Sequence, residues 1–174
     1  LDLHLSQVAP MVWEGFLGSE DTAVIEVTGI RADGSLIPST SVGNNKTWID
    51  RAQKVILEVN LRQNPALEGM HDIYYGTAVP PHRLPIPLVH PGDRIGEPYL
   101  RCDPAKVAAV VVTNTPDRHG AFDPPHATSR AIAGHLVGFL PHEVKAGRLP
   151  ANLLPLQSGV GHTANAVLAA LARS

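Results

Sequence analysis

Apolar residues in this chain occur in short runs, and the runs have two different periods. Nearly continuous β-branched runs are typical of strands, whereas apolar residues spaced three or four apart are typical of helices. Strands are predicted over 22–30, 36–41, 54–60 and 106–114. Helices are predicted over 6–18, 44–51, 128–147 and 163–173. Because strands alternate with helices, the pattern predicts an α/β fold with an open, mainly parallel sheet and flanking helices.

The strongest strand signal is the run KVAAVVVTN over 106–114. Its lack of polar alternation is typical of a parallel strand that is buried on both faces. Residues 61–100 differ in texture, because seven prolines there favour an extended, loop-rich section. We therefore divide the chain into residues 1–150, which include this section, and residues 151–174. The second part is predicted to contain a short strand over 153–156, a glycine loop and the last helix.

Composition narrows the classes of function. Of the 174 residues, 44% are hydrophobic and 17% are charged, which supplies enough apolar surface for a packed core. A net charge of −2 argues against a nucleic-acid binder. The single cysteine, Cys102, excludes an intramolecular disulfide and a cysteine-based zinc site. No apolar run approaches the roughly 20 residues of a membrane-spanning helix, and the chain starts with neither Met nor a signal-peptide profile. We expect a cytoplasmic protein without membrane contact, incomplete at its front.

The glycine loop carries the clearest candidate chemistry. Gly159, Gly161 and Ala164 fit the spacing G-x-G-x-x-[G/A] at the start of a predicted helix. Glycines let a backbone approach a phosphate, and the positive end of a helix favours an anion. Three interpretations stay open: a dinucleotide site, a turn without a ligand, and a loop for another phosphate-bearing or thioester ligand. The third is favoured, because the acidic residue that normally follows a dinucleotide loop is missing.

Other reactive side chains give weaker signals. The histidines His126, His135 and His142 do not have the spacing of a helical metal site, so no metal is predicted. Cys102 is interpreted as an ordinary thiol. Glu26 and Glu58 lie inside apolar strands, where a carboxylate needs a partner, and each is either a site residue or part of a structural pair.

Five longer motifs follow one another along the chain: PSTSVGNNK at 38–46, LEGMHDIY at 67–74, PPHR at 80–83, GDRIGEPY at 92–99 and LLPLQSGVG at 153–161. In this order they resemble the acetyl-CoA hydrolase/CoA-transferase family, the class I CoA-transferases. The resemblance covers the whole chain but only the middle of the much longer family members. It implies a fold like that of the CoA-transferase superfamily, with residues 1–150 forming the later part of the N-terminal domain. Residues 151–174 would lead toward the catalytic domain.

The resemblance also implies a mechanism. A glutamate attacks an acyl-CoA thioester, and a glutamyl-CoA thioester then passes CoA to a carboxylate, or to water in hydrolysis. CoA and acyl-CoA are substrates, and no cofactor is bound permanently. Acetate, succinate or propionate would be the carboxylate, and the full-length protein would be a homodimer. The residues that contact CoA in this family match Gln157, Ser158, Gly159, Val160 and Gly161.

Two departures from the family pattern bear on function. The family's nucleophilic glutamate lies beyond Ser174, so no catalytic residue is assigned and the chain alone is expected to be inactive. The alternative is a non-catalytic fragment that binds CoA. The family normally has Asn after the glycine loop, where this chain has His162, and this change affects acyl specificity. Arg94 and Arg118 are weaker candidates for placing anionic groups.

Overall fold

The computed structural model describes residues 2–90, 92–118, 124–154 and 156–174. Its contacts divide the chain into two compact units, Leu1–Asp117 and Arg118–Ser174, and each is considered by itself. The domain boundary that the sequence analysis places at residue 150 stays a prediction.

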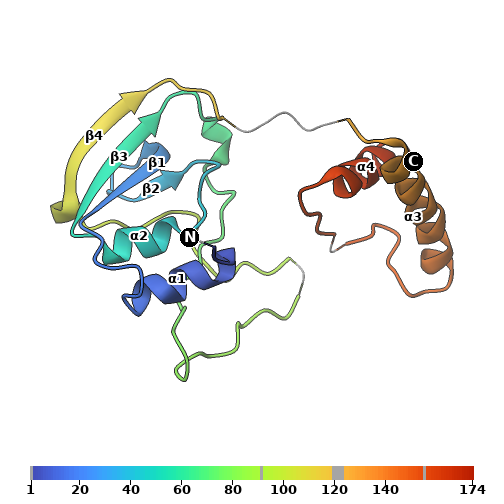
Figure 1. The fold of residues 1–174 in the computed structure, drawn as a ribbon, viewed down its shortest axis with the longest axis horizontal. Helices are drawn as coiled ribbons and strands as arrows, with labels where there is room; N and C mark the ends of the chain where they lie inside the picture. Colours follow the sequence, from blue (N-terminus) through green and yellow to red (C-terminus); the bar gives the residue numbers. More distant parts are fainter. Residues whose placement is uncertain (1, 91, 119–123, 155) are drawn as a thin grey trace. The chain divides into compact units, whose positions relative to one another are not determined.

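The first unit is built on a four-stranded sheet (Figure 1). Its strands are β1 (Thr22–Ile30), β2 (Leu36–Pro38), β3 (Lys54–Asn60) and β4 (Val107–Thr113), in the order β2-β1-β3-β4. The β1–β3 and β3–β4 pairs are parallel, and the short β2 pairs antiparallel with β1. The structure thus confirms an open, mainly parallel α/β sheet, because the β-branched runs that predict β1 and β3 form those strands with the predicted bounds.

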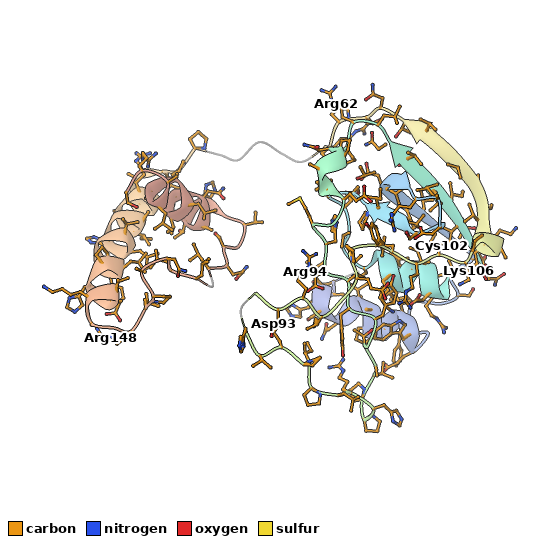
Figure 2. The ribbon with its side chains drawn as sticks, turned by 180° about the vertical axis from the view of Figure 1, so that it is seen from behind. Arg62, Asp93, Arg94, Cys102, Lys106 and Arg148 are labelled. Atoms are coloured by element: carbon orange, nitrogen blue, oxygen red, sulfur yellow. The ribbon has the colours of Figure 1, made fainter. Side chains whose placement is uncertain are left out.

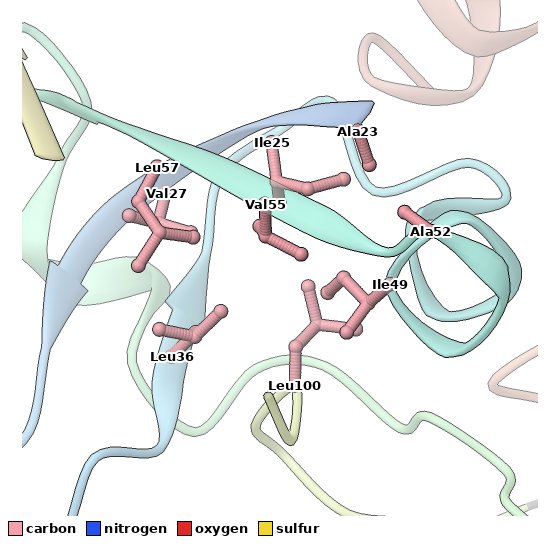
Figure 3. Close-up of a cluster of buried hydrophobic side chains, with 9 residues drawn as sticks. All are labelled: Ala23, Ile25, Val27, Leu36, Ile49, Ala52, Val55, Leu57 and Leu100. Carbon is pink, nitrogen blue, oxygen red and sulfur yellow. The ribbon is translucent and has the colours of Figure 1, made fainter. Parts of the chain in front are cut away.

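The core of the first unit lies on one face of this sheet. Alternate residues of β1 and β3 point to that face, and α2 (Asn45–Arg51) packs there through Ile49, as does Ala52, the residue after the helix (Figure 3). Leu36 and Leu100, each 1% exposed, close the cluster, and their main chains are paired as an isolated bridge. Burying one such aliphatic side chain stabilises the fold by about 1.5–3 kcal/mol. A further helix, α1 (Leu5–Trp13), and two 3₁₀ turns, Pro65–Leu67 and Pro104–Lys106, complete this unit.

The prediction that the strand over 106–114 is buried on both faces is wrong for this structure. β4 is parallel as expected, but it lies at the edge of the sheet, and Val110, Val111 and Val112 are 51%, 46% and 64% exposed. Its register with β3 places Val110 beside the buried Leu57 and Val111 beside Glu58. The run is apolar throughout, yet the described residues of its unit cover it only in part.

Hydrogen bonds join two motifs of the proline-rich section, LEGMHDIY and GDRIGEPY. Ile73 and Glu97 form an isolated antiparallel bridge, with N···O distances of 2.8 and 2.9 Å. Asp72 accepts hydrogen bonds from the backbone N–H of Gly96, at 2.6 Å, and of Ile95, at 3.3 Å. Backbone and carboxylate hydrogen bonds therefore join the parts of this section around Ile73 and Glu97.

The described residues of the second unit include two helices, α3 (Ala127–Lys145) and α4 (His162–Leu171). α3 begins at a His126 cap, before the predicted Thr128, and continues through Pro141. The strand predicted over 153–156 is absent from its described residues, Leu153, Leu154 and Leu156. Leu153 has a φ of 56°, which is incompatible with an extended strand. No helix in the described part of the chain is long and apolar enough to cross a membrane.

Candidate functional site

The predicted CoA-contacting loop lies directly before α4 in the second unit. Gln157, Ser158, Gly159 and Val160 are exposed, and Gly161 is half-buried. Gly161 is the N-cap residue of α4, with a φ of 143° that only glycine adopts without strain. Its carbonyl accepts the first helical hydrogen bond from the Asn165 N–H at 2.9 Å. The backbone therefore turns sharply into the helix at the position where the sequence places a glycine.

The local contacts of the loop leave it open to a ligand. The Gln157 amide donates to the Ser158 carbonyl at 3.1 Å, the Ser158 hydroxyl to the Gly159 carbonyl at 3.4 Å, and the Val160 side chain is 93% exposed. Because the N-cap residue of α4 is a glycine, it has no side chain that could cap the helix. The first N–H groups of a helix carry partial positive charge, so this end of α4 can accept an anionic or developing negative oxygen.

A second polar cluster lies near the carboxyl ends of the parallel strands in the first unit. One oxygen of Glu26, on β1, accepts from the Ser39 hydroxyl at 2.6 Å. Its other oxygen accepts from the Asn60 amide, at the end of β3, at 2.7 Å. Asn60 also donates to the Thr115 carbonyl at 2.8 Å and accepts from the Thr115 N–H at 3.1 Å. Ser39 and Asn60 are 0% and 2% exposed, so these bonds form in a largely desolvated environment.

The cluster extends through Gln63 to the last residue of the first unit. The Gln63 amide donates to Asp117 at 2.7 Å and to Glu26 at 3.4 Å, and the Thr40 hydroxyl donates to Asp117 at 2.9 Å. The side chains of Glu26, Asn60 and Gln63 thus connect β1, β3 and the segment after β4. Because each carboxylate in this cluster accepts hydrogen bonds, we interpret it as a structural network that fixes the loops at this edge of the sheet.

Four glutamates of the first unit lie in its sheet or motifs, and all are engaged; one of them, Glu97, is paired with Arg101. Glu26 belongs to the network, and Glu58 accepts from the Thr113 hydroxyl at 2.7 Å. Glu68 accepts from the Tyr99 hydroxyl at 3.1 Å and lies 3.4 Å from Arg31 Nε. Of the two interpretations left open for Glu26 and Glu58, the contacts favour the structural pair.

The other residues considered in the sequence analysis are Arg94, Arg118, Cys102 and the histidines. Arg94, which is labelled in Figure 2, lies in the proline-rich section. It donates to the carbonyls of Gly69, at 2.9 Å, and His71, and so links two parts of that section. Arg118 is exposed. Burial raises the pKa of the Cys102 thiol, which lowers its nucleophilicity at neutral pH. Among the described residues, no three His, Cys, Asp or Glu side chains come close enough to hold a metal ion.

Sequence reasoning missed most of the network around Glu26. Ser39, Gln63 and Asp117 are far apart in the chain, and each looks like an ordinary loop residue. The available signal is positional: polar residues follow directly after neighbouring strands, and such residues meet at one edge of a parallel sheet. It also missed the contact of His126 with His162, whose ring centroids are 5.2 Å apart in the second unit.

Comparison with known proteins identifies the relatives. The sequence model of the acetyl-CoA hydrolase/transferase N-terminal domain matches residues 1–112, more than half of the chain. The succinyl-CoA:acetate CoA-transferase of Clostridium kluyveri is 47% identical over 173 residues, which are 99% of this chain and 32% of that protein. The acetyl-CoA hydrolase of Schizosaccharomyces pombe is 49% identical over 179 residues, 99% of this chain and 34% of that protein. The propanoyl-CoA:succinate CoA transferase of Escherichia coli is 44% identical over 171 residues, 98% of this chain and 35% of that protein.

The chain spans about a third of the length of these curated relatives. Neither the family match nor the relatives favour the dinucleotide interpretation of the glycine spacing. The order of the motifs, the mainly parallel sheet and these matches agree, and the chain belongs to the acetyl-CoA hydrolase/transferase family.

Proposed function

We propose that this chain is the CoA-contacting part of an acyl-CoA hydrolase or CoA-transferase that moves CoA between short-chain carboxylates. One observation carries the proposal above all. The loop Gln157–Gly161, which the family resemblance associates with CoA, lies largely exposed at the N-terminal end of a helix whose N-cap residue is a glycine. The names of the relatives, which specify acetyl-, succinyl- and propanoyl-CoA chemistry, support the same substrate class.

The proposed role of the loop follows from its charge distribution. When a nucleophile attacks a thioester, negative charge develops on the carbonyl oxygen, and backbone N–H donors aimed at that oxygen lower the barrier. The glycines at 159 and 161 carry no side chain that would block this approach. In this proposal, Gln157, Ser158, Gly159, Val160 and Gly161 bind CoA near its reacting end.

The reaction itself needs a nucleophile that this chain is not proposed to supply. A glutamate carboxylate attacks the thioester carbonyl, which forms an acyl-glutamyl anhydride and releases CoA thiolate. The thiolate then attacks the glutamyl carbonyl of the anhydride, which expels the acyl group as a free carboxylate and leaves a glutamyl-CoA thioester. Acetate, succinate or propionate then collects CoA by the reverse steps, whereas attack by water gives hydrolysis. Glu26, Glu58 and Glu68 are all held by hydrogen bonds within the first unit, so none of them is proposed for this step.

Two measurements on the 174-residue chain test the proposal. Loss of acetyl-CoA thioester, followed by ultraviolet absorbance with and without succinate, is expected to show no turnover. Calorimetric titration is expected to show binding of CoA and not of NAD. Gly161→Ala should weaken CoA binding, because alanine is strained at a φ of 143°. Gly138→Ala on α3 is the matched control, since nothing lies within 4 Å of its added Cβ.

Each outcome separates the alternatives. CoA binding without turnover supports a CoA-contacting part whose nucleophile lies elsewhere, and this result is also what a non-catalytic CoA-binding fragment would give. Reconstitution of turnover with the remaining two thirds of a relative would distinguish these two. Consumption of thioester by the chain alone would place the nucleophile within it and contradict the assignment. The cytoplasmic location and the homodimer of the full-length protein stay predictions.

A further inference from the structure

The N-terminal ends of α3 and α4 contact each other through two histidine rings in the second unit. His126 precedes α3 and His162 begins α4, and their ring centroids lie 5.2 Å apart with the planes tilted by 42°. Such a tilted arrangement is within the range that aromatic pairs prefer. The contact joins the helix that carries the glycine loop to the neighbouring helix of the same unit.

His126 is itself held in place from within α3. Its Nδ1 accepts a hydrogen bond from the Ser129 N–H at 3.3 Å, which makes His126 the side-chain cap of this helix. The Ser129 hydroxyl lies 3.2 Å from each of the two ring nitrogens, and Ser129 is fully buried. The buried serine fixes the imidazole, and the imidazole presents its ring to His162.

The contact between the histidine rings limits the conformational freedom of the Gln157–Gly161 loop. Glycine has more backbone conformations to lose on binding than other residues, and Gly159 and Gly161 bracket the exposed Val160. A loop whose end is already held loses less entropy when a ligand binds, which raises affinity. His162 follows Gly161 directly, so a contact that holds its ring also limits the glycine before it.

We propose that His126 is a positioning residue for the Gln157–Gly161 loop, acting through its ring contact with His162. This inference rests on the proposed function of that loop as the CoA contact. His126 has two separable roles: its ring nitrogen caps α3, and its ring face holds the start of α4.

Two variants of the full chain separate these roles. His126→Asn keeps an oxygen that can cap the helix but removes the ring. His126→Phe keeps a ring but removes the cap. His135→Asn, at an exposed position within the same helix, is the control for the substitution itself. The measurements are the ¹⁵N heteronuclear NOE of the Gly159 and Gly161 amides in the ligand-free chain, the affinity for CoA, and the thermal midpoint.

We expect each variant to affect a different measurement. His126→Asn lowers the two glycine NOE values and weakens CoA binding about two- to tenfold, with little change in the thermal midpoint. His126→Phe lowers the midpoint but retains the NOE values and the affinity. The inference is overturned if His126→Asn leaves the glycine NOE values unchanged, or if His126→Phe lowers them equally. If the wild-type chain does not bind CoA but His126→Asn still loosens the loop, the proposed function fails and the positioning role stands.

Discussion

Gly96 cannot carry a side chain without movement of the backbone opposite it. A Cβ at this position would lie 2.3 Å from the carbonyl carbon of Ile73, 2.4 Å from its oxygen and 2.7 Å from its nitrogen. Atoms at such distances overlap, and the obstacle is main chain that has no rotamer to change. Gly96→Ala must therefore separate the two segments that meet at Ile73 and Glu97.

The magnitude follows from the hydrogen bonds that this separation breaks. The Ile73–Glu97 bridge contributes two bonds, at 2.8 and 2.9 Å, and the Asp72 carboxylate adds a bond to the Gly96 N–H at 2.6 Å. At about 0.5–1.5 kcal/mol for each of these three bonds, the expected loss is about 1.5–4.5 kcal/mol. For a unit of this size, that corresponds to a fall of about 6–18 °C in the thermal midpoint.

Thermal and urea unfolding, followed by circular dichroism, measure this loss. Gly92→Ala is the matched control, because it lies in the same section and nothing is within 4 Å of its added Cβ. It should unfold with the wild-type midpoint. If Gly96→Ala does the same, the contact between the two segments contributes no stability, and the reasoning from backbone overlap is refuted.

Two further perturbations test the polar contacts. Glu26→Gln places an amide donor where both carboxylate oxygens accept side-chain hydrogen bonds. It should lower the free energy of unfolding, measured in urea, by about 1–3 kcal/mol. The control Glu14→Gln, at an exposed position, should leave the free energy of unfolding unchanged. An unchanged midpoint for Glu26→Gln would contradict the network. The hydrogen bond from Arg148 lowers the pKa of Glu143. The stability that this ion pair adds to the fold is therefore complete above the usual pKa of a glutamate, and it is lost as the pH falls through the lowered pKa of Glu143. In an NMR titration, Arg148→Gln should raise that pKa to its usual range; no change would exclude Arg148 as the cause.

The sequence by itself determined the elements whose signals are local. β1 and β3 have the predicted bounds, because continuous β-branched runs favour extended backbone wherever they pack. The helix after Asn44 and the helix after the glycine loop were also found, since each depends on spacing within a few turns. The ordered motifs indicated the family without any tertiary information.

Other properties were decided only by the tertiary structure. The valines of β4 satisfy a buried pattern but lie at a sheet edge, because exposure depends on neighbours that the pattern does not contain. The residues 153–156 form no strand where described, since an extended segment becomes a strand only when another strand supplies its hydrogen bonds. The partners of Glu26 come from segments up to 37 residues away, and chain folding alone brings such groups together. Neighbouring residues determine the local backbone preference. Burial, strand pairing and side-chain partners depend on contacts between residues that are far apart in the sequence.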